Sequence, residues 1–172
     1  MKRDRWTLLA VGGAALAYAC IMLPASSVAT EPVAVAVADF DYIDTSGEVI
    51  DQNQAHMQRL HDLAQHVRDG LSQSGRYRIV RLTCEPAPCS AGRTDPAELL
   101  AKARAVGARL LVYGGIQKMS TLIQYGNAEV VDLEADRLVF DQNISFRNDS
   151  DEAWQRAAKF LVAELVKEDL VR

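Results

Sequence analysis

Blocks of apolar residues separated by polar stretches predict a series of strands and helices after residue 30. Residues 33–39 form a valine-rich apolar run, which is typical of a strand buried on both faces. The polar stretch 41–53 is expected to form a loop. From 54 to 74, apolar side chains recur at steps of three and four, which predicts a helix. Its expected buried stripe consists of Met57, Leu60, Ala64, Val67 and Leu71.

The second half of the chain continues with a strand, a helix, three strands and a final helix. Their expected ranges are 77–82, 96–106, 110–119, 122–133, 138–146 and 149–170. Gly114 and Gly115 lie inside one of these strands, which predicts a bulge or the close approach of another backbone. The order β-α-β-α-β-β-β-α predicts a single α/β (α+β) domain, with a mixed sheet and helices packed on it.

Local signals define the helix starts and the buried face of the last strand. Asp95 before Pro96 is a favourable cap for the second helix. Asp149 and Glu152 have the spacing of a capping box at the start of the last helix. On the last strand, one face is expected to pack together, and it consists of Leu138, Phe140, Ile144 and Phe146.

Residues 1–29 carry the three parts of a secretory signal peptide. Three basic residues precede an apolar run from 6 to 23, and small residues at 27 and 29 suit cleavage after Ala29. The expected organisation is therefore a signal at 1–29 and one domain at 30–172, located in the periplasm. An uncleaved anchor, which would be the only contact with a membrane, and a lipoprotein modified at Cys20 are the alternatives.

Removal of the signal makes the chain more acidic. The whole chain has 19 Lys and Arg against 23 Asp and Glu, and the signal holds three of these bases and one acid. The remainder has 16 bases and 22 acids, a net charge of −6. Such a domain is a poor partner for nucleic acid or for an anionic lipid surface, because both require a basic face.

Cys84 and Cys89 are the two cysteines that remain after the signal, and an even number in an exported chain predicts a disulfide. The loop between them is short, so the bond is expected to add about 2 kcal/mol or less to stability. Two thiolates without a second Cys or His pair do not make a structural zinc site. The preferred interpretation is a structural disulfide that stabilises a loop.

The three histidines and one lysine could suggest metal binding or catalysis, but their spacing supports neither role. His56, His61 and His66 are five residues apart, so successive side chains point about 140° apart around a helix and cannot converge on one metal. They are expected to be ordinary residues of the helix surface. Lys118 and Ser120 have no accompanying oxyanion-hole motif and are expected to form the turn into the hairpin.

Two groups of residues are candidate binding sites. Asp39, Asp41, Asp44 and Glu48 follow the first strand, where α/β sheets often bind ligands, and carboxylates suit hard cations. Solvated loop acids are the alternative. The second group, a candidate partner-binding patch, is Arg147, Asp149, Asp151 and Trp154. Its alternative is structural: Asp149 caps the helix, Trp154 packs, and Arg147 pairs with an acid.

Three segments, 39–48, 114–122 and 146–154, resemble a family of exported bacterial proteins of unknown function, DUF2380. In the family pattern a glycine stands where this chain has Asn148. The order of elements is also similar to the N-terminal domain of TolB and to the related domain of the curli secretion protein CsgG. These resemblances imply an envelope module that binds other proteins or assists an assembly.

The sequence therefore predicts a non-enzymatic accessory or protein-interaction module of the bacterial envelope. No arrangement of nucleophile, base and orienting group is recognisable, and no cofactor or metal is expected. The expected partner is another envelope protein. The alternative function is a protein that binds a small ligand or a hard metal ion through the acidic loop 39–48.

Overall fold

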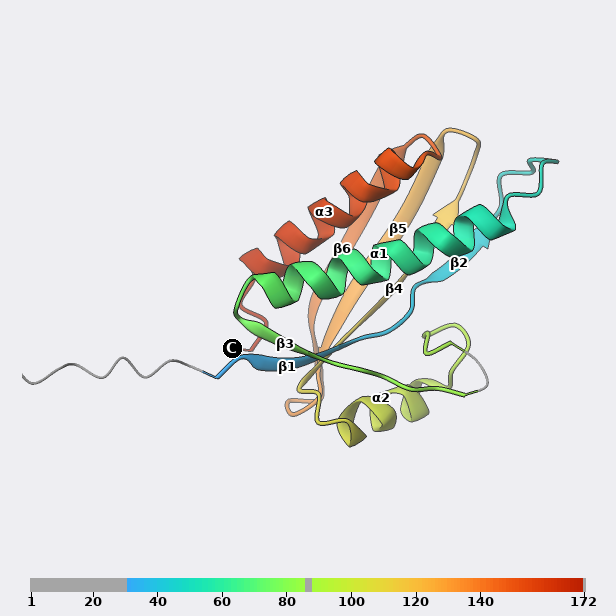
Figure 1. The fold of residues 1–172 in the computed structure, drawn as a ribbon. Coiled ribbons are helices and arrows are strands. Elements are labelled where there is room, and N and C mark those ends of the chain that lie inside the picture. Colours follow the sequence, from blue (N-terminus) through green and yellow to red (C-terminus); the bar gives the residue numbers. More distant parts are fainter. Residues whose placement is uncertain (1–30, 86–87, 172) are drawn as a thin grey trace, which may run out of the picture. The chain divides into compact units, whose positions relative to one another are not determined.

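The computed structural model describes residues 31–85 and 88–171, and the proposed signal at 1–29 lies outside them. Three helices and a mixed six-stranded sheet form an α+β fold, as expected (Figure 1). The elements are β1 (Val33–Val37), β2 (Asp41–Asp44), α1 (Asn53–Gln73), β3 (Tyr77–Val80), α2 (Pro96–Ala105), β4 (Leu110–Lys118), β5 (Ile123–Asp132), β6 (Arg137–Arg147) and α3 (Asp151–Lys167). Over the described ranges, no helix combines the length and apolar character that a membrane span requires.

The sheet has the strand order β3-β1-β4-β5-β6, and β2 pairs with β4 beyond the end of β1. β1 is parallel to β3 and β4, and β2 is parallel to β4. β4, β5 and β6 are antiparallel to one another. One long strand, β4, therefore connects the parallel part of the sheet to the hairpin.

The prediction of a loop over 41–53 was wrong for its first four residues, which form β2. Asp41 to Asp44 pair with Gly115 to Lys118 of β4. The acids Asp41 and Asp44 at its two ends made this short segment resemble a loop, although backbone pairing requires no apolar pattern. The close approach predicted at the paired glycines is confirmed: a Cβ on Gly114 would lie 2.2 Å from the backbone oxygen of Asn127.

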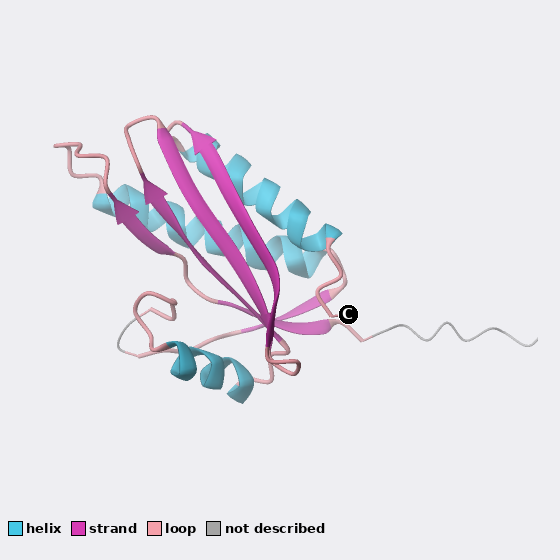
Figure 2. Cartoon of the chain, turned by 180° about the vertical axis from the view of Figure 1, so that it is seen from behind, coloured by secondary structure: helices cyan, strands magenta, loops and turns pink. Residues whose placement is uncertain are grey.

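Helices cover the two faces of the sheet unequally. α1 and α3 lie side by side over one face, with the main hydrophobic core beneath them (Figure 1). Seen from behind, the long strands lie in front of these two helices, and α2 lies near one end of the sheet (Figure 2). A smaller core, which includes Ala36, Leu111 and Leu99, forms under α2. The face of the hairpin that is turned away from α1 and α3 carries polar side chains.

The buried stripe of α1 is shifted relative to the prediction. His56, Leu60, Leu63, Ala64, Val67 and Leu71 are buried. Met57 is 45% exposed, so its assignment to the core was wrong. His56 occupies the inward position instead, because its ring bonds to a buried carboxylate on another element.

Two further local predictions are corrected by the structure. Ser150, rather than Asp149, caps α3 by accepting a hydrogen bond from the amide of Ala153. Leu138 is 49% exposed, because a register shift between Val130 and Val131 turns it away from the face that Phe140 occupies.

Other local predictions are confirmed. Asp95 caps α2 and accepts from the amides of Ala97 and Glu98. Cys84 and Cys89 form the expected disulfide, with sulfur atoms 2.06 Å apart. Asn148 has a φ of 76°, a left-handed conformation that asparagine tolerates better than most residues. A glycine would adopt the same conformation without strain.

Candidate functional site

Five charged or titratable side chains from separate segments meet at one end of the sheet. Lys118 comes from the end of β4, Glu48 from the β2–α1 loop, His56 and Arg59 from α1, and Asp149 from the turn before α3. We call this group the Asp149 cluster. Lys118 and His56 are each only 1% exposed, so the cluster is largely removed from water.

Asp149 is the centre of the cluster and receives four contacts. Oδ2 lies 2.7 Å from Nε2 of His56 and 3.0 Å from Nζ of Lys118. Oδ1 accepts hydrogen bonds from Nη1 of Arg59 at 2.8 Å and from the indole nitrogen of Trp154 at 3.1 Å. Both oxygens are therefore satisfied by protein groups, as a buried carboxylate requires.

The charges of the cluster are mutually stabilised. Burial alone would raise the pKa of Asp149, but the bonds from His56, Lys118 and Trp154 outweigh burial and lower this pKa to about 2. Burial likewise opposes the charge on Lys118, but its bonds to Glu48, at 2.5 Å, and to Asp149 raise the pKa of this ammonium. Lys118 is thus a charged ammonium at neutral pH, whereas a nucleophilic lysine needs a lowered pKa.

The depressed pKa of Asp149 predicts a loss of stability in acid. The carboxylate contributes stability that is complete above its unfolded pKa of 3.8 and is lost as the pH falls towards its folded pKa of about 2. Asp149→Asn cannot titrate, so the difference in free energy of unfolding between wild type and variant is expected to shrink by about 2 kcal/mol from pH 6 to pH 2. Denaturant titrations across this range measure it. A constant difference would contradict the assignment.

Aromatic rings enclose one side of the cluster. The rings of Tyr42 and His56 are stacked with centroids 4.5 Å apart, and Trp154 lies 6.3 Å from His56 and 5.6 Å from Phe146. Burial, followed by the nearby charge of Asp44, raises the pKa of the Tyr42 hydroxyl. The expectation that His56 is a surface residue was therefore wrong. His61 and His66 are exposed, as expected.

The candidate patch is rearranged rather than assembled as predicted. Asp149 and Asp151 are bonded by Arg59 of α1, whose Nε lies 2.8 Å from Oδ1 of Asp151, and not by Arg147. Arg147 is exposed at the end of β6, and Trp154 is 3% exposed within the core. Asp149, Asp151 and Trp154 thus lie at one site, where Asp149 and Trp154 are largely enclosed and Asp151 is exposed.

Sequence reasoning missed Lys118, His56 and Arg59, although one signal for Lys118 was present. Lys118 follows Leu110, Val112 and Ile116 at even spacing, which places it on the inward face of β4. It was expected in a turn, and this was wrong. An inward lysine at the end of a buried strand requires a buried acid, and no local pattern identifies Asp149 as that acid.

The four acids of loop 39–48 bind separate partners. Asp39 lies 3.2 Å from Arg68, and Asp44 accepts from the hydroxyl of Ser46 at 2.7 Å. Asp41 accepts hydrogen bonds from the side chain of a serine and from a backbone amide, both in the loop before α2. Glu48 bonds Lys118. Within the part of the chain that the structure describes, no three His, Cys, Asp or Glu side chains are grouped so as to hold a metal ion.

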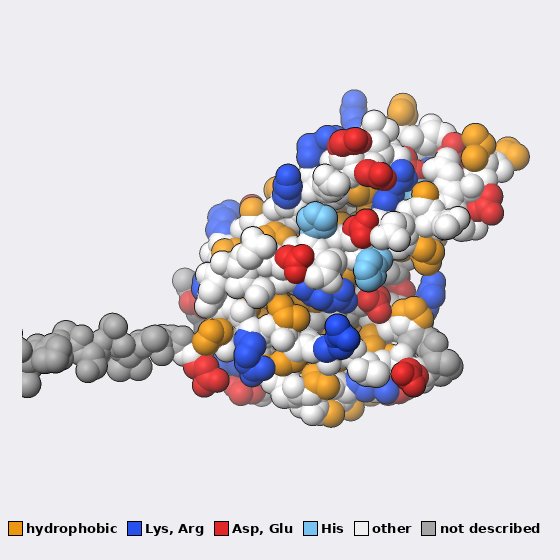
Figure 3. Space-filling model, viewed as in Figure 1, with side chains coloured by type: hydrophobic (Ala, Val, Ile, Leu, Met, Phe, Trp, Pro, Cys, Tyr) orange, Lys and Arg blue, Asp and Glu red, His pale blue; other side chains and the backbone are white. Residues whose placement is uncertain are grey.

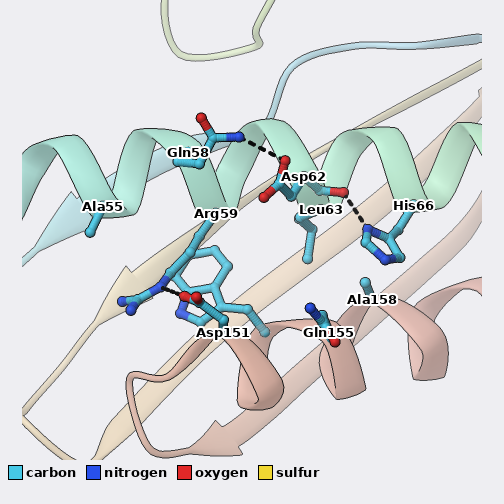
Figure 4. Close-up of a pocket in the computed structure, with 10 residues that line it drawn as sticks. Ala55, Gln58, Arg59, Asp62, Leu63, His66, Asp151, Gln155 and Ala158 are labelled. Atoms are coloured by element: carbon cyan, nitrogen blue, oxygen red, sulfur yellow. Dashed lines mark hydrogen bonds and ion pairs between the residues drawn. The ribbon is translucent and has the colours of Figure 1, made fainter.

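A groove of about 290 Å³ lies between α1 and α3, next to the Asp149 cluster. Figure 4 shows that several of its polar side chains are bonded to neighbours: Gln58 donates to Asp62, and Arg59 donates to Asp151. The ring of His66 contacts the backbone oxygen of Asp62. These bonds occupy much of the polar capacity that a ligand would need.

Exposed apolar side chains gather at the same end of the sheet as the cluster. They belong to β2, the β2–α1 loop, the β4–β5 turn and the start of β5. We call them the apolar tip: Ile43, Val49, Ile50, Met119, Leu122 and Ile123. Figure 3 shows hydrophobic side chains protruding at this end of the molecule. Val49 is 98% exposed and Leu122 is 66% exposed.

The segments of the tip are tied to one another and to the cluster. The amide of Thr45, at the start of the loop, donates to the backbone oxygen of Lys118 at 2.9 Å. The amide of Asn148 donates to the backbone oxygen of Leu122 at 2.8 Å. Together with the Glu48–Lys118 ion pair, these bonds connect the β2–α1 loop, the β4–β5 turn and the turn before α3.

Comparison with protein families identifies the chain. Residues 33–166 match the family described as "Protein of unknown function (DUF2380)". The chain belongs to this family. The resemblance seen in segments 39–48, 114–122 and 146–154 is thereby confirmed. A search of curated proteins finds no match.

Solved structures share the fold at low sequence identity. The hypothetical protein CT253 from Chlamydia trachomatis is 13% identical, with a TM-score of 0.52, over 78% of this chain and 96% of that one. The PelC dodecamer from Paraburkholderia phytofirmans is 16% identical, with a TM-score of 0.51, over 79% and 86%. TolB from Acinetobacter baumannii is 13% identical over 79% of this chain and 28% of that one, with a lower TM-score of 0.45. The likenesses to CT253 and to PelC show the fold alone.

Proposed function

We propose that this protein is a non-enzymatic accessory module of the bacterial cell envelope and that it binds another envelope protein through the apolar tip. The observation that carries the proposal is the exposure of large apolar side chains on neighbouring segments at one end of the sheet. Apolar groups gathered on a surface mark interaction sites, because binding removes them from water.

The tip is suited to binding because its segments are fixed before a partner arrives. Glu48 and Lys118 connect the β2–α1 loop to β4, and Asp149 connects Lys118 to the turn before α3. A preorganised surface loses less conformational entropy on association than a mobile loop does. The Asp149 cluster therefore supports the proposed binding surface without touching the partner.

Features outside the tip support an envelope location. Residues 1–29 have the composition of a secretory signal, and the Cys84–Cys89 disulfide suits an oxidising compartment such as the periplasm. The net charge of −6 expected after cleavage argues against nucleic acid as the partner. Lys118 and His56 are buried and bonded to carboxylates, which supports a role in structure rather than in catalysis.

Site-specific photo-crosslinking in cells tests the proposal. A photoreactive amino acid at Val49 is expected to give one discrete crosslinked protein adduct. Leu138 is the matched control, since it is apolar and 49% exposed but lies at the opposite end of the sheet. Leu122→Asp is expected to remove the adduct at position 49 while leaving the melting temperature nearly unchanged, because Leu122 is 66% exposed.

Three results would contradict the proposal. The first is the absence of an adduct at position 49. The second is the same set of adducts at positions 49 and 138. The third is crosslinking of position 49 to lipid instead of protein.

A further inference from the structure

Strand β4 contains a glycine, Gly115, that the packing of the domain does not require. A Cβ on Gly114 or on Gly126 would lie 2.2 or 2.5 Å from a neighbouring atom, so close packing explains both of these glycines. A Cβ on Gly115 would come no nearer than 3.4 Å, to the backbone oxygen of Asp41, which is an ordinary contact. Gly115 has no left-handed φ, and β4 pairs with β5 in regular register at this position. A glycine inside a strand weakens it, and the approach of a ligand is one reason to keep it.

A hollow of about 470 Å³ lies over Gly115, on the face of the sheet that is turned away from α1 and α3. Figure 2 shows this face, with the long strands in front of the two helices. Tyr113 and Gln117 lie two residues before and after Gly115, so their side chains are on the same face of β4. Asp41 of β2 and Asn127 of β5 are the direct partners of Gly115. All four side chains line the space that Gly115 leaves open, which we call the Gly115 hollow.

The Gly115 hollow carries negative charge that no described cation balances. Asp41 and Glu129 line it, and none of the described residues around it is Lys, Arg or His. Asp41 accepts hydrogen bonds from a serine hydroxyl and a backbone amide, and Glu129 accepts from the hydroxyl of Tyr113 and the amide of Asn127. All four donors are neutral. Glu129 also lies directly opposite Asp141 of β6, and like charges opposite each other destabilise a sheet. A bound cation would relieve this repulsion.

The free polar atoms of the hollow are hydrogen-bond acceptors. Each carboxylate oxygen of Asp41 and Glu129 accepts one hydrogen bond, which leaves further lone pairs. The side-chain nitrogens of Asn127 and Gln117 donate to other side chains, so the amide oxygens of both residues remain as acceptors. A ligand that fits this lining therefore brings several donors as well as positive charge.

The aromatic lining favours a planar cation. The rings of Tyr113 and Tyr125 both line the hollow. A guanidinium group is planar, carries five N–H donors and stacks on aromatic rings, and it is more weakly hydrated than an ammonium. Tyr125 is 40% exposed and Ile43, at the rim, is 60% exposed. The hollow is thus too open to enclose a small molecule as binding pockets do, and it suits a side chain that a larger partner holds in place.

We propose that the Gly115 hollow binds the guanidinium group of an arginine side chain on the partner protein. This inference rests on the proposed function, because Ile43 belongs both to the apolar tip and to the rim of the hollow. A protein bound at the tip therefore lies next to the hollow. Charge complementarity selects the arginine, since its cation would meet Asp41 on one side of Gly115 and Glu129 on the other.

Titration of the isotope-labelled protein with acetylargininamide, followed by NMR, tests the chemistry of the hollow directly. The probe is expected to bind saturably at millimolar concentration and to shift the amide signals of 113–117 and 125–129. Acetylcitrullinamide has nearly the same shape without the charge, and it is expected to bind at least about tenfold more weakly.

Matched variants identify the site. Gly115→Val is expected to abolish binding of acetylargininamide by filling the hollow, without lowering the melting temperature, because valine suits a strand. Ser145→Val adds a similar side chain to the same face of β6, outside the hollow, and is expected to have little effect. Glu129→Gln is expected to weaken binding at least about tenfold, whereas Glu98→Gln makes the same change in net charge on α2 and is expected to have little effect.

Crosslinking in cells connects the hollow to the partner. With the photoreactive amino acid at position 49, Gly115→Val is expected to reduce the yield of the protein adduct at least about threefold. Ser145→Val is expected to leave this yield unchanged.

Three results would overturn this inference while leaving the apolar tip intact. The first is the absence of saturable binding of acetylargininamide, or equal binding of the citrulline compound. The second is binding that persists in Gly115→Val. The third is a full yield of the position-49 adduct in a Gly115→Val protein that no longer binds the probe. The absence of the position-49 adduct from the protein with Gly115 in place would instead contradict the proposed function itself, so the two failures are distinguishable.

Discussion

Replacing Asp149 with alanine is expected to lower the free energy of unfolding by about 3–5 kcal/mol at pH 7. The substitution removes the carboxylate that Lys118, His56 and Arg59 share. Lys118 is 1% exposed, so its ammonium stays away from water with Glu48 as the remaining counter-charge. Urea denaturation followed by circular dichroism measures the loss.

Two comparisons test whether burial is the reason for this loss. Asp151→Ala removes a carboxylate that also bonds Arg59, but Asp151 is 73% exposed, and the expected loss is below about 1 kcal/mol. Combining Lys118→Met with Asp149→Ala is expected to recover part of the stability lost in the single variant, because it removes the stranded ammonium. Equal losses for Asp149→Ala and Asp151→Ala would refute the buried cluster.

Replacing Trp154 with alanine is expected to have a similar effect, a loss of about 3–5 kcal/mol. Trp154 is 3% exposed, contacts the rings of Tyr42, His56 and Phe146, and donates a hydrogen bond to Asp149. Its removal leaves a cavity beside the cluster and takes one donor from the carboxylate. The same denaturation experiment measures the effect.

Phe160→Ala is the control for Trp154→Ala. Both aromatic residues lie on α3, but Phe160 is 48% exposed and its removal leaves no closed cavity. Its expected cost is less than roughly half that of Trp154→Ala. A loss at Phe160 as large as that at Trp154 would show that aromatic content of the helix, rather than burial, determines the result.

The position of the Asp149 cluster links stability to the proposed function. Buried ion pairs are an inefficient source of stability, because desolvation opposes their attraction. Here the pairs connect β4, the β2–α1 loop, α1 and the turn before α3, which are the segments around the apolar tip. We interpret the cluster as a set of contacts that fixes these segments relative to one another.

Much of the fold was predictable because its signals are local. The helix over 54–74 follows from apolar residues at steps of three and four, and Asp95 with Pro96 marks the start of α2. The disulfide follows from two cysteines in a short loop. Each of these features depends on residues that are near one another in the chain, so the sequence by itself determined them. The family membership also follows from continuous segments.

The tertiary structure alone decided which polar residues are buried and where the free surfaces lie. Lys118, His56 and Asp149 are far apart in the sequence, and their burial is favourable only because the fold brings Nε2 of His56 and Nζ of Lys118 within 3.0 Å of the Asp149 carboxylate. β2 forms because β4 offers backbone partners, and Leu138 is exposed because of a register shift. These outcomes depend on pairing between distant segments, and no periodicity within one segment encodes that pairing.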